Sequence, residues 1–190
     1  GSHSNNKSGN DRPDRERLFT TELTGSGATT MLSFGAHYAF LEDDLLAWDS
    51  GNGHGLGVNF LGLAASAGNG IVPEASNGFS IEGLSMAPGS TTTAYLGFRA
   101  PIVPASARSR ALIIPVTNFT SLPGMASGTS AFGTPIQLDL GGRGIRSLEC
   151  NANGCLIIAG DSGTAGNFRL YRWSGNAADT PVEMVTELSG

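Results

Sequence analysis

The sequence predicts an all-β protein, a β-propeller built from four-stranded antiparallel blades, and three observations support this prediction. The chain repeats itself at an interval of about 64 residues. Each repeat contains four short runs rich in β-forming residues, separated by turn residues, and Gly contributes 28 of the 190 residues. Charged residues make up only 14%, which favours tight turns over long helices. Four short antiparallel strands per repeat are typical of a propeller blade.

The two complete repeats align run by run. Ile81 matches Ile145 in the first run, and Gly97 matches Gly160 at the end of the second run. The runs are FSIEGLS, TTAYLGF, SRALIIPV and PIQLDL in the first repeat, and RGIRSLEC, CLIIAG, NFRLYRW and PVEMVTEL in the second.

The third runs show how their strands face. In RLYRW, Leu170 and Arg172 point to one side and Tyr171 to the other. In ALIIPV both sides are mostly apolar, which predicts an inner strand packed between neighbouring blades.

The predicted domain is a single, partial propeller that spans the whole chain. We expect part of a blade over residues 1–35, a helical insertion over 36–75, and complete blades over 76–140 and 141–190.

The N-terminal part fits the repeat as the end of a second strand, a polar loop and a third strand. Gly1 then matches Gly97, and RERLFTTEL matches the third runs of the complete repeats. The alternative is that GSHS is the remnant of an expression tag.

The insertion contains one clear helical pattern. Tyr38, Leu41, Leu45 and Trp48 recur at helical spacing, and Gly51 provides a stop, which predicts a helix over about 36–49. A second, weaker helix is expected within LGVNFLGLAASA, so the helical part lies near 36–64.

The repeats amount to about two and a half blades, whereas propellers close with four to eight. An open set would leave unpaired strand edges. We therefore expect the rest of a longer chain, or a second chain, to close the ring.

Composition excludes two classes of partner. The net charge of −5 argues against a binder of nucleic acid, which usually presents a basic face. No apolar stretch approaches the roughly 20 residues of a membrane helix, so no membrane partner is expected.

The two cysteines flank the segment NANG, which predicts a four-residue hairpin loop with Cys150 and Cys155 opposite each other. That placement favours a disulfide, and two free thiols are the alternative. The spacing lacks a second ligand pair for zinc. A disulfide would indicate a periplasmic or secreted protein, and free thiols a cytoplasmic one.

Several motifs are shared with a known family: GSHS with RPDRERLF, IEGL, LGFRAP, ALIIPV, LDLGGRGIRSLE, LIIAG and RLYRW. In these motifs the chain resembles a family of bacterial β-propellers known only as a domain of unknown function. That family is distantly similar to propellers named for an esterase-like phytase. The resemblance implies a propeller fold and supplies no proven reaction, because one fold hosts many functions.

Matching positions on the first strands carry opposite charges. Glu82 and Arg146 occupy these positions, where side chains of innermost strands point into a channel. They can hold a polar ligand together, or they can form a salt bridge between blades.

Two further candidates lie two residues after the matching glycines. These are His3, which can act as a general acid or base, and Arg99, which can clamp an anion. The alternative is that both cap loops. The last repeat has Asp161 near this place, so a site here would not be symmetric.

The remaining candidates have simpler interpretations. Arg143 follows two glycines whose backbone N–H groups can face an anion, although a tight turn explains it equally. GNGHG, with His54, reads as a flexible linker, and the acidic trio Glu42–Asp44 as a solvated helix face. The His residues show no metal-ligand spacing, so no metal site is predicted, and the cofactor stays open.

Two functions follow from these candidates. The first is a binding scaffold whose polar channel mouth takes a small polar or anionic ligand or a protein partner. The alternative is a hydrolase of phosphate or other esters that uses His3, Glu82 and Arg99, although no G-x-S-x-G or HExxH motif is present. Convergence of these side chains in one pocket would favour an anion site.

Overall fold

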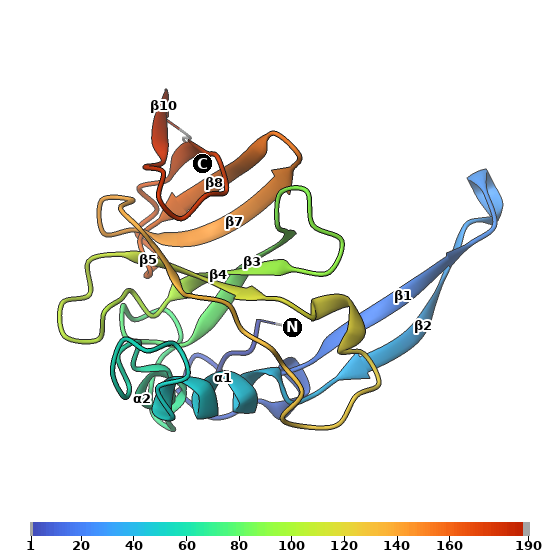
Figure 1. The fold of residues 1–190 in the computed structure, drawn as a ribbon, viewed down its shortest axis with the longest axis horizontal. Coiled ribbons are helices and arrows are strands. Elements are labelled where there is room, and N and C mark those ends of the chain that lie inside the picture. The colour runs from blue at the N-terminus through green and yellow to red at the C-terminus, as the bar shows by residue number, and fades with distance from the viewer. Residues whose placement is uncertain (1, 188–190) are drawn as a thin grey trace.

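The computed structural model describes residues 2–187, which fold mostly into antiparallel strands (Figure 1). Strands make up 35% and helices 13%, so the all-β fold class is confirmed. The strands are β1 (Leu18–Thr24), β2 (Met31–Tyr38), β3 (Ser80–Met86), β4 (Ala94–Ala100), β5 (Ala111–Val116), β6 (Ile136–Leu138), β7 (Gly144–Asn151), β8 (Gly154–Gly160), β9 (Arg169–Trp173) and β10 (Val182–Glu187), and the helices are α1 (Leu41–Ser50) and α2 (Leu63–Ala67).

Two four-stranded antiparallel sheets form the body of the molecule. One contains β3, β4, β5 and β6 in that order, and the other contains β7, β8, β9 and β10. Each sheet corresponds to one repeat, so the prediction of four strands per repeat is confirmed. These sheets do not close into a ring within residues 2–187, and the propeller remains a prediction. Gly1, from the predicted partial blade over 1–35, and residues 188–190, from the predicted blade over 141–190, lie outside the described residues.

The two sheets stack on each other, and apolar side chains from both fill the space between them. Ile113 and Leu138 of the first sheet share one buried cluster with Ile145 and Ile157 of the second. Packing of this kind removes apolar surface from water and is the main stabilising contribution to the fold.

Two glycines allow the sheets to approach closely. A Cβ at Gly97 would lie 2.7 Å from Cγ2 of Ile145, and a Cβ at Gly83 would lie 3.0 Å from Cβ of Leu148. A side chain at Gly97 would therefore require Ile145 of β7 to shift.

The predicted facing of the third strands is confirmed. Tyr171 and Trp173 of β9 are buried between the sheets, while Arg172 is exposed on the outer side. All residues of β5 are buried, because this strand lies between the second sheet on one side and the helices on the other.

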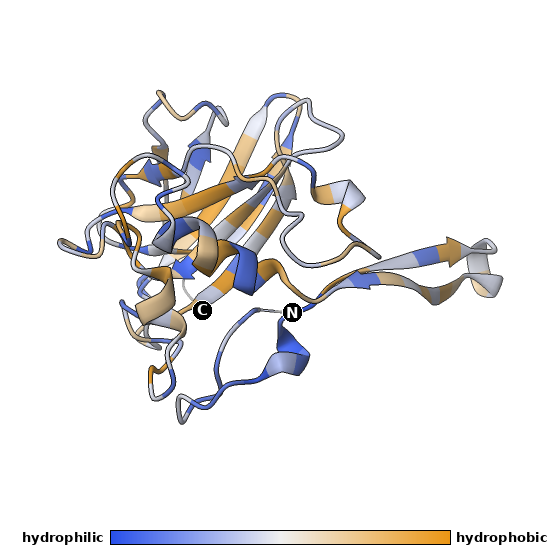
Figure 2. Cartoon of the chain, turned by 60° about the horizontal axis from the view of Figure 1, so that its bottom comes forward, coloured by the Kyte–Doolittle hydropathy of each residue, from blue (hydrophilic) through white to orange (hydrophobic). Residues whose placement is uncertain are grey.

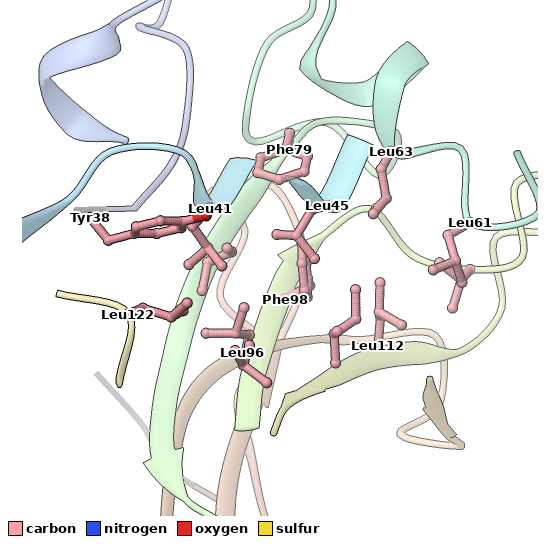
Figure 3. Close-up of a cluster of buried hydrophobic side chains, with 14 residues drawn as sticks. Tyr38, Leu41, Leu45, Leu61, Leu63, Phe79, Leu96, Phe98, Leu112 and Leu122 are labelled. Carbon is pink, nitrogen blue, oxygen red and sulfur yellow. The ribbon is translucent and has the colours of Figure 1, made fainter. Parts of the chain in front are cut away.

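The helices cover the second face of the β3–β6 sheet (Figure 3). Leu41 and Leu45 of α1 and Leu63 of α2 pack in one buried cluster with Leu96 and Phe98 of β4. Each fully buried Leu contributes about 2 kcal/mol relative to an exposed one. α1 begins later than predicted because residues 36–38 still belong to β2, and α2 is the short second helix.

The N-terminal strand β1 belongs to neither of the four-stranded sheets. β1 pairs with β2 alone in a two-stranded sheet, and this hairpin projects away from the body (Figures 1 and 2). RERLFTTEL thus forms a strand, as predicted, and its assignment to a partial blade remains a prediction. The pairing of β1 with β2 was not predicted. Among the described residues, no other strand pairs with β1.

Candidate functional site

Glu82 is the centre of the candidate site. It lies on β3, an edge strand that is adjacent to β7 of the second sheet. Its Oε1 accepts a hydrogen bond from Nη1 of Arg99 at 2.9 Å, and its Oε2 accepts one from Nε of Arg146 at 2.7 Å. The structure therefore brings three of the predicted residues together, and the salt bridge between repeats is present.

The two arginines also hold the loop that follows β8. Arg99 donates from Nε to the carbonyl of Ser162 at 2.7 Å and from Nη2 to that of Gly163 at 3.1 Å. Arg146 donates from Nη1 to the carbonyl of Asp161 at 3.1 Å. Asp161 thus joins the group through its backbone. Charged hydrogen bonds of this kind fix the direction of both guanidinium groups.

A polar pocket of about 190 Å³ adjoins Glu82 and Arg99. Two more cations, Lys7 and Arg15, line it, and Glu74 supplies a second carboxylate. Cations outnumber carboxylates here, although the chain as a whole carries −5. The rest of the lining is mostly polar and consists of Ser2, Ser4, Asn5, Pro73 and Ser80.

The N-terminal segment is fixed in place and forms one wall of this pocket. The N–H of Ile81 donates to the carbonyl of Ser2 at 2.9 Å. The side-chain amide of Asn5 donates to the carbonyls of Gly68 and Ile71, both at 3.1 Å. The pocket therefore has walls defined by hydrogen bonds between segments that are far apart in the sequence.

His3 lies on the other side of Glu82. It is buried, with positive φ (51°), and its N–H donates to the carbonyl of Arg15 at 3.4 Å. His3, Arg17 and Glu82 line a pocket of about 300 Å³ whose other walls are mostly apolar. Glu82 thus belongs to both pockets, while His3 and Arg99 lie in different ones.

Arg143 lies apart from this group. It donates from Nε and Nη2 to the backbone and side-chain oxygens of Asn167, at 3.0 and 3.1 Å, and from Nη1 to Leu140 at 3.1 Å. These bonds hold the turn before β7 against the loop before β9. The position of the Arg143 side chain is therefore accounted for by its role in a tight turn.

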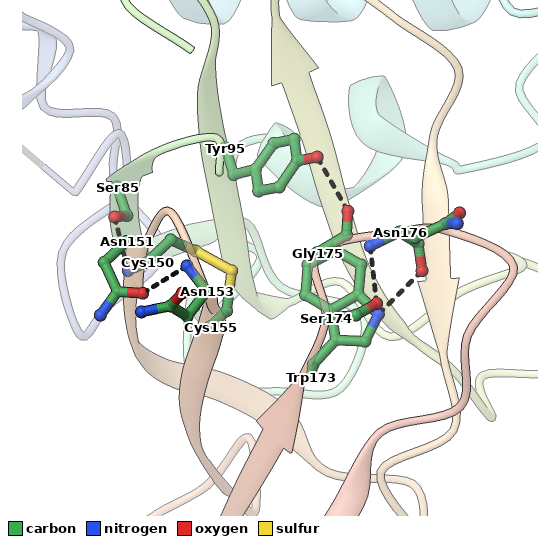
Figure 4. Close-up of a disulfide and its surroundings, with 10 residues drawn as sticks. All are labelled: Ser85, Tyr95, Cys150, Asn151, Asn153, Cys155, Trp173, Ser174, Gly175 and Asn176. Atoms are coloured by element: carbon green, nitrogen blue, oxygen red, sulfur yellow. Dashed lines mark hydrogen bonds between the residues drawn. A yellow bond between two sulfur atoms is a disulfide. The ribbon is translucent and has the colours of Figure 1, made fainter. Parts of the chain in front are cut away.

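The disulfide between Cys150 and Cys155 is present (Figure 4). The two residues are paired across β7 and β8, with Cα atoms 4.0 Å apart. The predicted four-residue loop is wrong, because Asn151 and Gly154 still pair as strand residues and leave a two-residue turn. Oδ1 of Asn151 accepts the N–H of Asn153 at 2.8 Å and closes that turn.

The glycine-rich segment after α1 is not a linker with a free histidine. The side chains of His54 and Asp49 are fully buried, with 3.0 Å between Nε2 and Oδ1. Nδ1 of His54 accepts the N–H of Leu56 at 3.1 Å, so Nε2 carries the proton. Asp49 also accepts N–H groups of Leu61 and Leu63, and the pair therefore stabilises the chain after α1.

In the acidic trio of α1, Asp44 forms hydrogen bonds within the protein, whereas a solvated helix face was predicted. Asp44 accepts hydrogen bonds from the N–H groups of Gly128 (2.8 Å) and Ser130 (3.1 Å) and from the hydroxyl of Tyr38. Burial alone would raise the pKa of Asp44, but these hydrogen bonds lower it below its usual value. This carboxylate therefore anchors a loop and is not a free solvated group.

Glu42 faces the N-terminal segment. Burial raises the pKa of Glu42 to about 8, and the nearby carboxylates of Glu16, Asp11 and Asp43 add to the effect. Burial together with Asp11 likewise raises the pKa of Glu16 to about 7. Within residues 2–187 no group of three or more His, Cys, Asp or Glu side chains is placed to hold a metal ion.

Several lining residues of the polar pocket were not predicted. Lys7, Arg15, Ser2 and Ser4 lie in polar stretches that resemble ordinary loops. The available signal was the concentration of hydroxyl, amide and basic side chains before residue 16, but nothing in the sequence shows that this segment folds back onto β3.

Comparison with known proteins identifies the family. A family model described as "Protein of unknown function (DUF3616)" matches residues 60–188, about two-thirds of the chain. The chain belongs to this family. The matched part of this DUF3616 protein includes both four-stranded sheets and Glu82, Arg99 and Arg146, whereas the motifs GSHS and RPDRERLF precede it.

No curated protein and no solved structure matches this DUF3616 chain. None of the helices in the part that the structure describes has the length and apolar character needed to cross a membrane.

Proposed function

We propose that this DUF3616 protein binds a small anion, a carboxylate or a phosphate, in the polar pocket beside Glu82. The observation that supports this most is the convergence of Lys7, Arg15 and Arg99 on one pocket of about 190 Å³. A pocket of this size suits a ligand of a few heavy atoms, and guanidinium groups match the geometry of carboxylate and phosphate.

The two carboxylates of the pocket have different roles in this proposal. Glu82 is occupied by its two arginines and fixes Arg99, so that binding does not have to order this side chain. Glu74 also lines the pocket and reduces its net positive charge. The ligand is therefore held by Lys7, Arg15 and the surrounding hydroxyl groups, with Arg99 as a prearranged partner.

The test is calorimetric titration of the full chain with inorganic phosphate and with succinate at low salt. We expect binding with a dissociation constant below about 1 mM, weakened about tenfold by Arg15→Gln. Arg12→Gln is the matched control, because Arg12 is exposed in the same segment and does not line the pocket. Absence of binding by both anions, or an equal loss in the control, would reject the proposal.

A hydrolase of phosphate or other esters is the second candidate. It is supported by the presence of His3, Arg17 and Glu82 in the same pocket of about 300 Å³. In such a reaction His3 takes a proton from water, the water oxygen bonds to phosphorus or to the acyl carbon, and the ester oxygen leaves with a proton. Turnover of p-nitrophenyl phosphate or p-nitrophenyl acetate that is lost in His3→Gln and kept in His37→Gln would support it.

We also infer the setting in which this site works. The outer face of the β7–β10 sheet, with Leu156 and Val182 exposed, is where a further propeller blade would stack, supplied by a longer chain or by a second chain. The disulfide is compatible with a periplasmic or secreted location. The similarity to esterase-like phytase propellers remains a prediction.

A further inference from the structure

The β1–β2 hairpin has one apolar face that is open to solvent. Leu23 pairs with Leu32 and Thr21 pairs with Phe34, and directly paired residues point to the same side of an antiparallel sheet. Alternation along β1 adds Phe19 to this side, and its partner His37 lies there as well, with its ring centroid 6.0 Å from that of Phe34. The exposed fractions are 53% for Phe19, 69% for Leu23, 68% for Leu32 and 66% for Phe34.

The opposite face of the hairpin has a different character. Glu22 and Ser33 pair there, next to Thr24 and Met31. A sheet with one apolar and one mostly polar face is the pattern of strands that are covered on one side. Exposed apolar patches of this kind mark interaction sites.

We propose that a second copy of this chain covers the apolar face, so that two hairpins pack face to face about a two-fold axis. The face that runs through Phe19, Thr21 and Leu23 and across to Leu32 and Phe34 carries no Lys, Arg, Asp or Glu side chain, and its one titratable group is His37, the partner of Phe19. It is therefore complementary to itself, which a symmetric contact requires. The hairpin projects from the body (Figures 1 and 2), so a second hairpin can reach this face.

The size of the face sets the strength of the contact. Four side chains that are 53–69% exposed would bury on the order of 1,000 Å² across two copies. Stable interfaces bury more than this, so the contact is a weak and reversible one, with a dissociation constant on the order of 10–100 µM. Each copy carries a charge of −5, so added salt strengthens the association by screening their repulsion.

Two neighbouring residues provide a matched pair of variants. Leu32 lies on the apolar face and Ser33 on the polar face of the same strand, and both are exposed. Leu32→Lys places a charge between the two hairpins, whereas Ser33→Lys places the same charge opposite Glu22 on the outer side. Since neither residue is buried, both variants are expected to fold like the unchanged protein.

The test is sedimentation velocity of the full chain between about 1 and 500 µM at low and moderate salt. We expect the unchanged protein and Ser33→Lys to form dimers as concentration and salt increase, and Leu32→Lys to stay monomeric. A protein that stays monomeric over the whole range overturns the proposal, as does an equal loss of dimer in both variants. Anion binding in the polar pocket is measured separately and does not depend on this outcome.

Discussion

Two hairpins of this molecule have similar lengths and opposite surroundings. The β7–β8 hairpin is closed by a disulfide, and its inner face, with Ile145 and Ile157, is buried against the first sheet. The β1–β2 hairpin also carries a mostly apolar face, with Leu23 and Leu32, that remains open to solvent. An apolar pattern in the sequence thus identifies a face that favours burial. Only the three-dimensional structure shows whether another segment buries it.

The largest expected effect comes from truncating one side chain on each hairpin. Ile157→Ala should lower the free energy of unfolding by about 3 kcal/mol, because it leaves a cavity between the two sheets. Leu23→Ala should change it by no more than about 0.5 kcal/mol at low concentration, because this side chain is 69% exposed. Urea denaturation at about 1 µM protein measures both. Equal losses would mean that the hairpins do not differ in burial.

Removal of the disulfide should have the next largest effect. Cys150 and Cys155 close a short loop, for which the entropy of the unfolded chain predicts a loss of about 2 kcal/mol on opening. Thermal unfolding with and without a reducing agent provides the measurement, and Cys150→Ser should reproduce the reduced value. An unchanged transition in both cases would show that β7–β8 is held by packing alone.

The root of the β1–β2 hairpin should be sensitive to pH. Glu42 has a folded pKa of about 8 because of burial and neighbouring carboxylates, so the folded state binds this proton more tightly than the unfolded chain. Stability is then complete below the unfolded pKa near 4.5 and falls as the pH rises through 8. After allowance for solvent screening, Glu42→Gln should raise stability by about 1–2 kcal/mol at pH 8 and leave it unchanged at pH 4. A variant with the same pH dependence as the unchanged protein would contradict this assignment.

The smallest expected effect concerns the ion pairs between the stacked sheets. Glu82→Gln should cost about 1 kcal/mol, because its two partners are largely shielded from solvent. Asp139→Asn, which weakens the exposed pair with Arg110, should cost no more than about 0.5 kcal/mol. Thermal unfolding at low and high salt separates the two, since only the exposed pair should respond strongly to salt. The reverse order would mean that Glu82 is not part of the contact between repeats.

The sequence predicted the parts of the fold that depend on local pattern. The repeat placed Glu82 and Arg146 at matching positions on two first strands, and stacking of the two sheets then brings them within 2.7 Å of each other. The spacing of the cysteines predicted their pairing, although the turn between them is shorter than expected.

The parts that were missed depend on contacts between distant segments. The pairing of β1 with β2 was not predicted, because the alternation of β1 suits any antiparallel neighbour. Burial of His54 depends on Asp49 accepting N–H groups from residues more than ten positions away. Lys7 and Arg15 line the same pocket as Arg99 only because the N-terminal segment folds back onto β3.

The most direct test of the contrast between the two hairpins is amide hydrogen exchange at about 1 µM and at about 500 µM protein. We predict slow exchange in β7 and β8 at both concentrations. In β1 and β2 we predict fast exchange at the low concentration and slower exchange at the high one, as a second copy covers the apolar face. Protection of β1 and β2 equal to that of β8 at the low concentration would contradict this account.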